Sequence, residues 1–262
     1  MARQSLKNVV HLINSANEQV PVEQDFLHDL KRSIEMSADK HHRPPSQTYK
    51  PSGMNCIRGM YYQIVGAEQD PSSSSYTLVG IVNSGSDIHE RIQTAILDMV
   101  NNGLDCEYVS VPDFLQSRGI EDIEVIDATG IETKLYHKKL NMSFLTDGII
   151  KYKGRYYILE LKTETSFKWG SRKGVDPKHY NQATAYSIAF GLDDVIFVYI
   201  NRDILDMKAF MLEVSSDMKN DLIGKITNCD DYVSKGEVPP KPTEASPKFC
   251  QYCAYRSLCD EC

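Results

Sequence analysis

Two hydrophobic periodicities divide the chain into helices and strands. Between residues 4 and 40, helical apolar spacing at 26, 27, 30 and 34 beside many charges predicts one or two helices. Another helix is predicted to begin at Asp87, since Asp87 and Glu90 have the spacing of a capping box. Its apolar stripe comprises Ile88, Ile92, Ala95, Ile96 and Met99.

The second half of the chain mixes strands with helices. Residues 144–162 predict a β-hairpin, with Lys153-Gly154 as its two-residue turn. The continuous apolar run at 195–200 predicts a strand buried on both faces, and 208–214 predicts its neighbour. Helices are predicted at 176–192 and 215–235. This order predicts an α/β fold whose central mixed β-sheet is flanked by helices.

The predicted hairpin brings two acids face to face. A turn at Lys153-Gly154 places Asp147 opposite Glu160, with Cβ atoms roughly 5 Å apart. Side chains alternate along a strand, so Glu160 and Lys162 share a face. Facing carboxylates repel unless a cation or proton lies between them, and their oxygens suit Mg²⁺ or Mn²⁺. The alternative is a surface hairpin with a Glu160–Lys162 salt bridge.

These residues, in this order, resemble the PD-(D/E)XK nuclease superfamily. The matching segments are Asp147…Glu160-Leu161-Lys162 and Gln182-x-x-x-Tyr186. His89 in GSDIHERIQ is similar to the histidine motif of the RecB-like branch. Phe144 departs from the glycine that the family often has three residues before its metal aspartate.

The resemblance implies a restriction-endonuclease-like core and a role for each matched residue. His89, Asp147, Glu160 and the carbonyl of Leu161 would hold the metal. Lys162 would assist the attacking water. Gln182 and Tyr186 would position the substrate or the lysine. An imidazole beside carboxylates suits Mn²⁺ somewhat better than Mg²⁺.

Four of the seven cysteines lie in the last thirteen residues. Cys250, Cys253 and Cys259 form a C-x2-C-x5-C pattern that can hold one metal centre with a fourth ligand, for which Cys56 is the candidate. A small zinc site is the alternative. Cys262 is either a substitute ligand or a free thiol. The remaining two, Cys106 and Cys229, are expected to be ordinary buried thiols.

The pattern resembles the iron–sulfur subgroup of RecB-like nucleases. This subgroup includes CRISPR-associated adaptation exonucleases and AddB-type nuclease domains. The resemblance implies a [4Fe–4S] cluster held by Cys56, Cys250, Cys253 and Cys259, which would form an iron–sulfur-bound cap on the nuclease core. The expected organisation is an N-terminal helical arm at 1–45 and a nuclease domain at 46–262.

Charge and composition narrow the expected partners. A net charge of −7 argues against a general polyanion binder, yet residues 151–180 carry eight Lys/Arg against three Asp/Glu. This basic strip, with the aromatic residues around it, is expected to contact DNA phosphates and bases. The chain has no apolar run of about 20 residues and no secretory pattern at its N-terminus, so a cytoplasmic protein without a membrane span is expected.

The expected function is metal-dependent DNA exonuclease activity on single-stranded or unwound ends. The resemblance implies a role in recombination, repair, phage DNA processing or CRISPR adaptation. The sequence contains no GxxxxGK[ST] motif, so a helicase, recombinase or CRISPR adaptation partner would supply unwound ends. Two alternatives remain open: a non-catalytic DNA- or protein-binding module, and a nuclease that acts on RNA.

Overall fold

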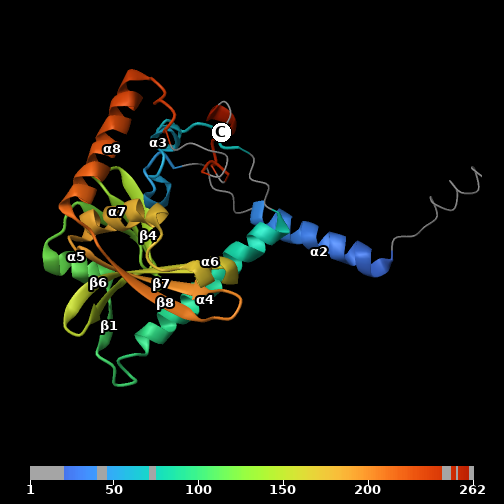
Figure 1. The fold of residues 1–262 in the computed structure, drawn as a ribbon, viewed down its shortest axis with the longest axis horizontal. Helices are drawn as coiled ribbons and strands as arrows, with labels where there is room; N and C mark the ends of the chain where they lie inside the picture. Colours follow the sequence, from blue (N-terminus) through green and yellow to red (C-terminus); the bar gives the residue numbers. More distant parts are fainter. Residues whose placement is uncertain (1–20, 40–45, 71–74, 244–248, 252, 260–262) are drawn as a thin grey trace, which may run out of the picture. The chain divides into compact units, whose positions relative to one another are not determined.

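A computed structural model describes residues 21–39, 46–70, 75–243, 249–251 and 253–259 (Figure 1). The chain divides into two compact units. The first comprises residues 1–43 and 73–81, and the second comprises 44–72 and 82–262. Helix α4 (Tyr76–Leu97) contributes its first residues to one unit and the rest to the other. Cys262 lies outside the described residues.

The first unit contains helix α2 (Val22–Asp39) and the start of α4. The backbone N–H of Tyr76 donates to Glu35 Oε1 at 3.0 Å, and Lys31 Nζ lies 4.7 Å from the centre of the Tyr76 ring. The predicted apolar stripe of α2 is exposed, from 66% at Phe26 to 36% at Ile34. The helix therefore forms without burying its apolar face against the described residues of this unit.

A five-stranded mixed sheet lies at the centre of the second unit, in the order β1-β5-β6-β7-β8. Its strands are β1 (Cys106–Val109), β5 (Ile149–Tyr152), β6 (Arg155–Glu164), β7 (Asp194–Asn201) and β8 (Met207–Glu213). Only the β6–β7 pair of this sheet is parallel. Its crossover contains α6 (Ser166–Ser171), the 3-10 turn Pro177–His179 and α7 (Tyr180–Phe190). The predicted mixed sheet flanked by helices is confirmed.

A second, three-stranded antiparallel sheet has the order β2-β3-β4. It consists of β2 (Ile123–Asp127), β3 (Thr133–His137) and β4 (Met142–Thr146). Helix α5 (Val111–Arg118) precedes it. Because β4 belongs to this sheet and β5 to the central one, the predicted hairpin at 144–162 was too long. The chain changes sheets at Asp147-Gly148, and the hairpin proper is β5–β6.

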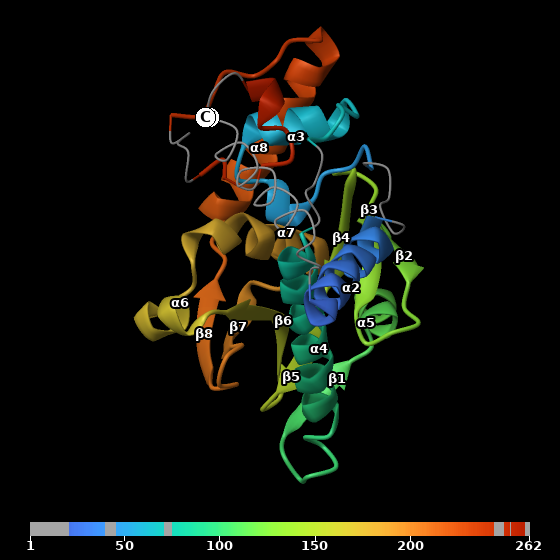
Figure 2. The ribbon, with the colours of Figure 1, turned by 90° about the vertical axis from the view of Figure 1, so that its right-hand side faces the viewer.

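Helices cover both faces of the central sheet (Figure 2). Ile158 packs in a core with residues of α5, α7, α3 (Ile57–Ile64) and α8 (Ser216–Lys235). The neighbouring Leu159 and Leu161 pack on the opposite face, in a core that includes Ile88 of α4. Strand β6 is thus buried on both sides, and Glu160 lies within its buried segment.

Helix α4 begins earlier than its sequence pattern predicts. Its first residue is Tyr76, and the N–H of Leu78 donates to the Ser75 hydroxyl at 3.3 Å. The prediction of a helix start at Asp87 was therefore wrong, because Ser75 provides the capping oxygen. His89 consequently lies in the middle of α4. A shorter 3-10 turn (Pro51–Gly53) precedes α3, and another (Ser257–Cys259) lies near the end of the chain.

Candidate active site

Asp147 lies where the chain passes from one sheet to the other. Its Oδ2 accepts a hydrogen bond from the N–H of Leu161 at 2.7 Å, which ties it to β6. Its backbone carbonyl accepts from Gln93 Nε2 at 3.1 Å and from the hydroxyl of Tyr108. The other carboxylate oxygen, Oδ1, lies 3.2 Å from His89 Nδ1. Strand β6 and helix α4 therefore both hold this carboxylate in place.

Gly148 makes this transition sterically possible. Its φ of 138° belongs to a region that residues with a Cβ rarely adopt. A Cβ at this position would overlap with the hydroxyl and ring of Tyr108. The glycine therefore lets Tyr108 reach the Asp147 carbonyl.

The β5–β6 hairpin has the register predicted from the sequence. Ile149 pairs with Ile158, and Tyr152 pairs with Arg155. The turn residues Lys153 and Gly154 have φ values of 49° and 78°, as the type I′ turn requires. Asp147 lies just before β5, and its carboxylate meets β6 at Leu161.

Glu160 is the most deeply buried acid of the predicted set, at 3% exposure. Its Oε1 accepts hydrogen bonds from Gln182 Nε2 at 2.8 Å and from Lys162. Its Oε2 is buried and has no hydrogen-bond partner. Burial raises the pKa of Glu160, the Lys162 ammonium opposes this shift, and the Asp147 carboxylate adds to it. A carboxylate oxygen without a partner in a buried segment is costly unless a cation or proton occupies the site.

Lys162, Gln182 and Tyr186 form a chain of hydrogen bonds beside Glu160. Lys162 Nζ donates to Gln182 Oε1 at 3.1 Å, and Gln182 Nε2 lies 3.0 Å from the Tyr186 hydroxyl. Tyr186 in turn donates to the carbonyl of Leu145 at 2.8 Å. Tyr186 is 2% exposed, and burial raises its pKa well above its usual value. It therefore holds Gln182, while Gln182 contacts both the lysine and the glutamate.

His89 and Asp147 come close enough to Glu132 for the three side chains to hold one metal ion, and the sequence pattern did not single out Glu132. Within the described residues, the ligand atoms of these three side chains all lie within 4.8 Å of one another. Burial lowers the pKa of His89, but the hydrogen bond and negative charge of Asp147 outweigh it, so the net shift is upward. Two carboxylates and an imidazole fit Mn²⁺ or Mg²⁺. Glu132 has no regular spacing to the motif residues, so no sequence signal pointed to it.

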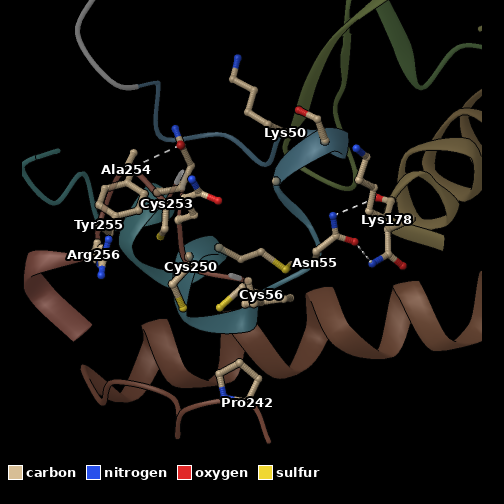
Figure 3. Close-up of a pocket in the computed structure, with 18 of the residues that line it drawn as sticks. Lys50, Asn55, Cys56, Lys178, Pro242, Cys250, Cys253, Ala254, Tyr255 and Arg256 are labelled. Atoms are coloured by element: carbon tan, nitrogen blue, oxygen red, sulfur yellow. Dashed lines mark hydrogen bonds between the residues drawn. The ribbon is translucent and has the colours of Figure 1, made fainter. Parts of the chain in front are cut away.

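The four predicted cluster cysteines line one cavity of about 1290 Å³ (Figure 3). Cys56 immediately precedes α3, while Cys250, Cys253 and Cys259 come from the C-terminal segment. Burial raises the pKa of the Cys253 thiol, and Cys56 and Cys259 contribute in the same direction. Cys56, Cys253 and Cys259 are free thiols, whereas Cys250 is disulfide-bonded. Four thiolate ligands therefore require reduction of that disulfide.

Hydrogen bonds attach the C-terminal segment to α3 and the residues after it. Tyr62 donates to the carbonyl of Leu258 at 2.9 Å, and the N–H of Asp70 donates to the carbonyl of Ala254 at 2.7 Å. Arg58 Nη1 lies 3.8 Å from Cys259 Sγ. The cysteines far apart in sequence are thus brought together by specific polar contacts. The other two, Cys106 and Cys229, are buried free thiols, as predicted.

Apart from its cysteines, the same cavity is lined by many basic side chains. Its described lining contains seven Lys or Arg residues and one acid, Asp176. The basic residues are Lys50, Lys168, Arg172, Lys178, Lys225, Lys241 and Arg256. Asn181 also lines the cavity, and the next residue, Gln182, contacts Lys162. The cavity therefore extends to the helix that carries part of the candidate active site.

Comparisons with known proteins give no family assignment. No family model and no curated protein matches the chain. A solved structure described as SSO0001 aligns with a TM-score of 0.47 and 15% identity over 89% of this chain and 96% of that one. The structure of LHK-Exo in complex with dAMP aligns with a TM-score of 0.43 and 11% sequence identity, over 72% of this chain and 89% of that one. A structure of the alkaline exonuclease LHK-Exo from Laribacter hongkongensis aligns with a TM-score of 0.38 and 10% sequence identity, over 78% of this chain and 93% of that one. All three TM-scores are below 0.5.

No helix in the described part of the chain combines the length and apolar character needed to cross a bilayer.

Proposed function

We propose that this chain is a metal-dependent DNA exonuclease of the PD-(D/E)XK type that acts on single-stranded or unwound ends. His89, Asp147, Glu160 and the Leu161 carbonyl are the proposed ligands of Mn²⁺ or Mg²⁺. When bound, the ion would lower the pKa of a water molecule and neutralise charge on the phosphate. The orphaned, buried Oε2 of Glu160 carries this proposal, because Glu160 also interacts electrostatically with the Asp147 carboxylate, and a cation or a proton would stabilise the buried oxygen.

Lys162 is the proposed group that orients the attacking water or stabilises the developing negative charge. Its Nζ is held by Glu160 and Gln182, and its side chain remains 22% exposed. Gln182 and Tyr186 are proposed to position this lysine. The hydroxyl of Tyr186 is committed to the Leu145 carbonyl, so this tyrosine acts through Gln182.

The basic cavity supports DNA as the substrate. A nucleic acid strand carries a phosphate at every nucleotide, and lysine and arginine side chains that follow the strand supply much of its binding energy. Lys50 lines this cavity, and burial together with the like charge of Lys134 lowers the pKa of its ammonium group. No acidic partner of Lys50 is present among the described residues. A bound phosphate would supply the missing negative charge.

A [4Fe–4S] cluster held by Cys56, Cys250, Cys253 and Cys259 is the proposed cofactor. Tetrahedral zinc with Zn–S bonds of about 2.3 Å holds its sulfur atoms about 3.8 Å apart. Cys56, Cys253 and Cys259 are free thiols that line one cavity together with Cys250. A [4Fe–4S] cluster, in which each cysteine binds a different iron, spaces its cysteine sulfur atoms more widely than a zinc ion does. Cluster binding would join the residues before α3 to the C-terminal segment.

Digestion of end-labelled DNA tests the nuclease proposal. Wild type, Lys162→Ala and the control Lys138→Ala, whose lysine is exposed in the turn between β3 and β4, are incubated with single-stranded DNA, duplex DNA and RNA in Mn²⁺ or Mg²⁺. We expect wild type and the control to shorten single-stranded DNA from its ends and Lys162→Ala to lose at least about a hundredfold in rate. DNA binding without cleavage in either metal would identify a binding module, and preferential RNA cleavage would identify a ribonuclease.

Purification without oxygen and with a thiol reductant tests the cluster proposal. We expect a brown protein that absorbs near about 400 nm and contains four iron atoms per chain. A colourless protein with one zinc ion per chain would contradict the proposal.

A further inference from the structure

Glu132 lies outside the catalytic motifs, yet its carboxylate reaches the same place as those of the motif residues. It immediately precedes β3 of the three-stranded sheet, whereas His89 comes from α4 and Asp147 from the junction of the two sheets. Its Oε1 lies 4.0 Å from His89 Nδ1. Burial raises the pKa of Glu132, and the nearby Asp147 carboxylate adds to this shift. Its ligand atom lies within 4.8 Å of that of Asp147, so the two acids are close enough to repel each other.

The spacing of the three side chains suits a single ion. In an octahedral site with bonds of about 2.1 Å, neighbouring ligand atoms are about 3.0 Å apart and opposite ones about 4.2 Å apart. His89 Nδ1 lies 3.2 Å from Asp147 Oδ1 and 4.0 Å from Glu132 Oε1. One divalent cation can therefore contact all three residues with only small adjustments of the side chains.

Tyr108 ties the segment before β3 to the junction that carries Asp147. Its hydroxyl donates to the carbonyl of Asp147 and lies 3.4 Å from the carbonyl of Ile131, the residue before Glu132. Burial raises the pKa of this tyrosine, so it stays neutral and keeps its proton. Both backbone segments are thus held by the same side chain, which fixes the distance between Glu132 and Asp147.

An independent observation, an unpartnered buried acid oxygen, calls for a cation or a proton in this region. Glu160, which is 3% exposed and interacts electrostatically with both Asp147 and His89, has a buried Oε2 without a partner. Three carboxylates, those of Glu132, Asp147 and Glu160, therefore interact with His89, while Lys162 is the cation bonded to Glu160.

We propose that Glu132 is a further ligand of the divalent ion, in addition to the ligands expected from the PD-(D/E)XK motifs. This inference rests on the proposed function, since it assumes that His89 and Asp147 bind that ion. The three-stranded sheet then has a direct role in the active site: it delivers a carboxylate to the metal. Loss of this ligand should weaken metal binding about tenfold.

Thermal unfolding and Mn²⁺ titration of the full chain test the proposal. Glu132→Gln should raise the Kd for Mn²⁺ about tenfold and reduce the rise in Tm that Mn²⁺ produces. In EDTA its Tm should equal or exceed that of wild type, because a repulsion with Asp147 is removed. A merely structural glutamate would instead lower the Tm in EDTA. Glu132→Asp, which keeps the charge, should restore part of the affinity.

Two further variants separate this inference from the proposed function. Glu124→Gln changes an exposed acid on the same sheet and should bind Mn²⁺ like wild type. Asp147→Asn should abolish binding. Wild-type affinity in Glu132→Gln, together with loss of binding in Asp147→Asn, would overturn the role of Glu132 alone. Failure of wild type to bind Mn²⁺ and to cleave DNA would overturn both proposals.

Discussion

Gly148 offers a stringent test of how the candidate site is built. Substitution by alanine places a Cβ in a backbone conformation with φ of 138° and against the side chain of Tyr108. Strain of this kind costs about 1–3 kcal/mol. Displacement of Tyr108 adds a further cost, because its hydroxyl bond to Asp147 and part of its ring burial are lost. We expect Gly148→Ala to lower the free energy of unfolding by about 3–5 kcal/mol.

Gly119 provides the matched control. It has φ of 65° at the end of α5, and an added Cβ would have no atom within 4 Å. Gly119→Ala should therefore cost only the left-handed backbone penalty, about 1–2 kcal/mol. The difference between the two variants measures the clash with Tyr108.

A double-mutant cycle in urea isolates that clash. Tyr108→Ala removes the atoms that the new Cβ would meet. The Gly148→Ala/Tyr108→Ala double variant should therefore lose about 1–3 kcal/mol less free energy of unfolding than the two single variants lose in total. Gly148→Ala should also weaken Mn²⁺ binding, since Asp147 is the adjacent residue. Equal costs for Gly148→Ala and Gly119→Ala, with no coupling to Tyr108, would refute the reasoning.

Three further predictions concern DNA, metal and cluster. Lys50→Ala should weaken binding of single-stranded DNA, measured by fluorescence anisotropy. It should also reduce by about 0.7 the steepness with which log K for DNA binding falls with log salt concentration. An unchanged slope would show that Lys50 does not contact a phosphate. Mn²⁺ affinity should fall about tenfold per pH unit below the pKa of His89, because a proton competes with the metal for the imidazole. That pKa lies above its usual value of about 6.5. A Kd for Mn²⁺ that does not change with pH would show that His89 is not a ligand. Cys253→Ser should eliminate the absorption of the cluster. It should also lower the free energy of unfolding by up to about 5 kcal/mol, because the cluster would no longer close a long loop of the chain. Normal absorption in this variant would show that Cys253 is not a ligand.

The sequence by itself determined the local geometry of the central hairpin. Lys153-Gly154 forms the predicted two-residue turn, with glycine at one of its two positive-φ positions, and alternation then places Glu160 and Lys162 on one face. The apolar run of β7 and the i, i+4 spacing of Gln182 and Tyr186 were equally informative, because strand burial and helix periodicity are local properties. Cys56 was related to Cys250, Cys253 and Cys259 through a family pattern, and the structure places these four in one cavity.

Only the tertiary structure decided where the hairpin ends and what else joins the site. The chain leaves β4 for another sheet at Asp147, and this change depends on the fit between Gly148 and Tyr108, 40 residues away along the chain. The early start of α4 depends on Ser75, which lies before the apolar stripe that marked the helix. Glu132 reaches His89 and Asp147 because two sheets meet, and no spacing along the sequence records such a meeting. Contacts between distant segments arise from packing, which local patterns do not encode.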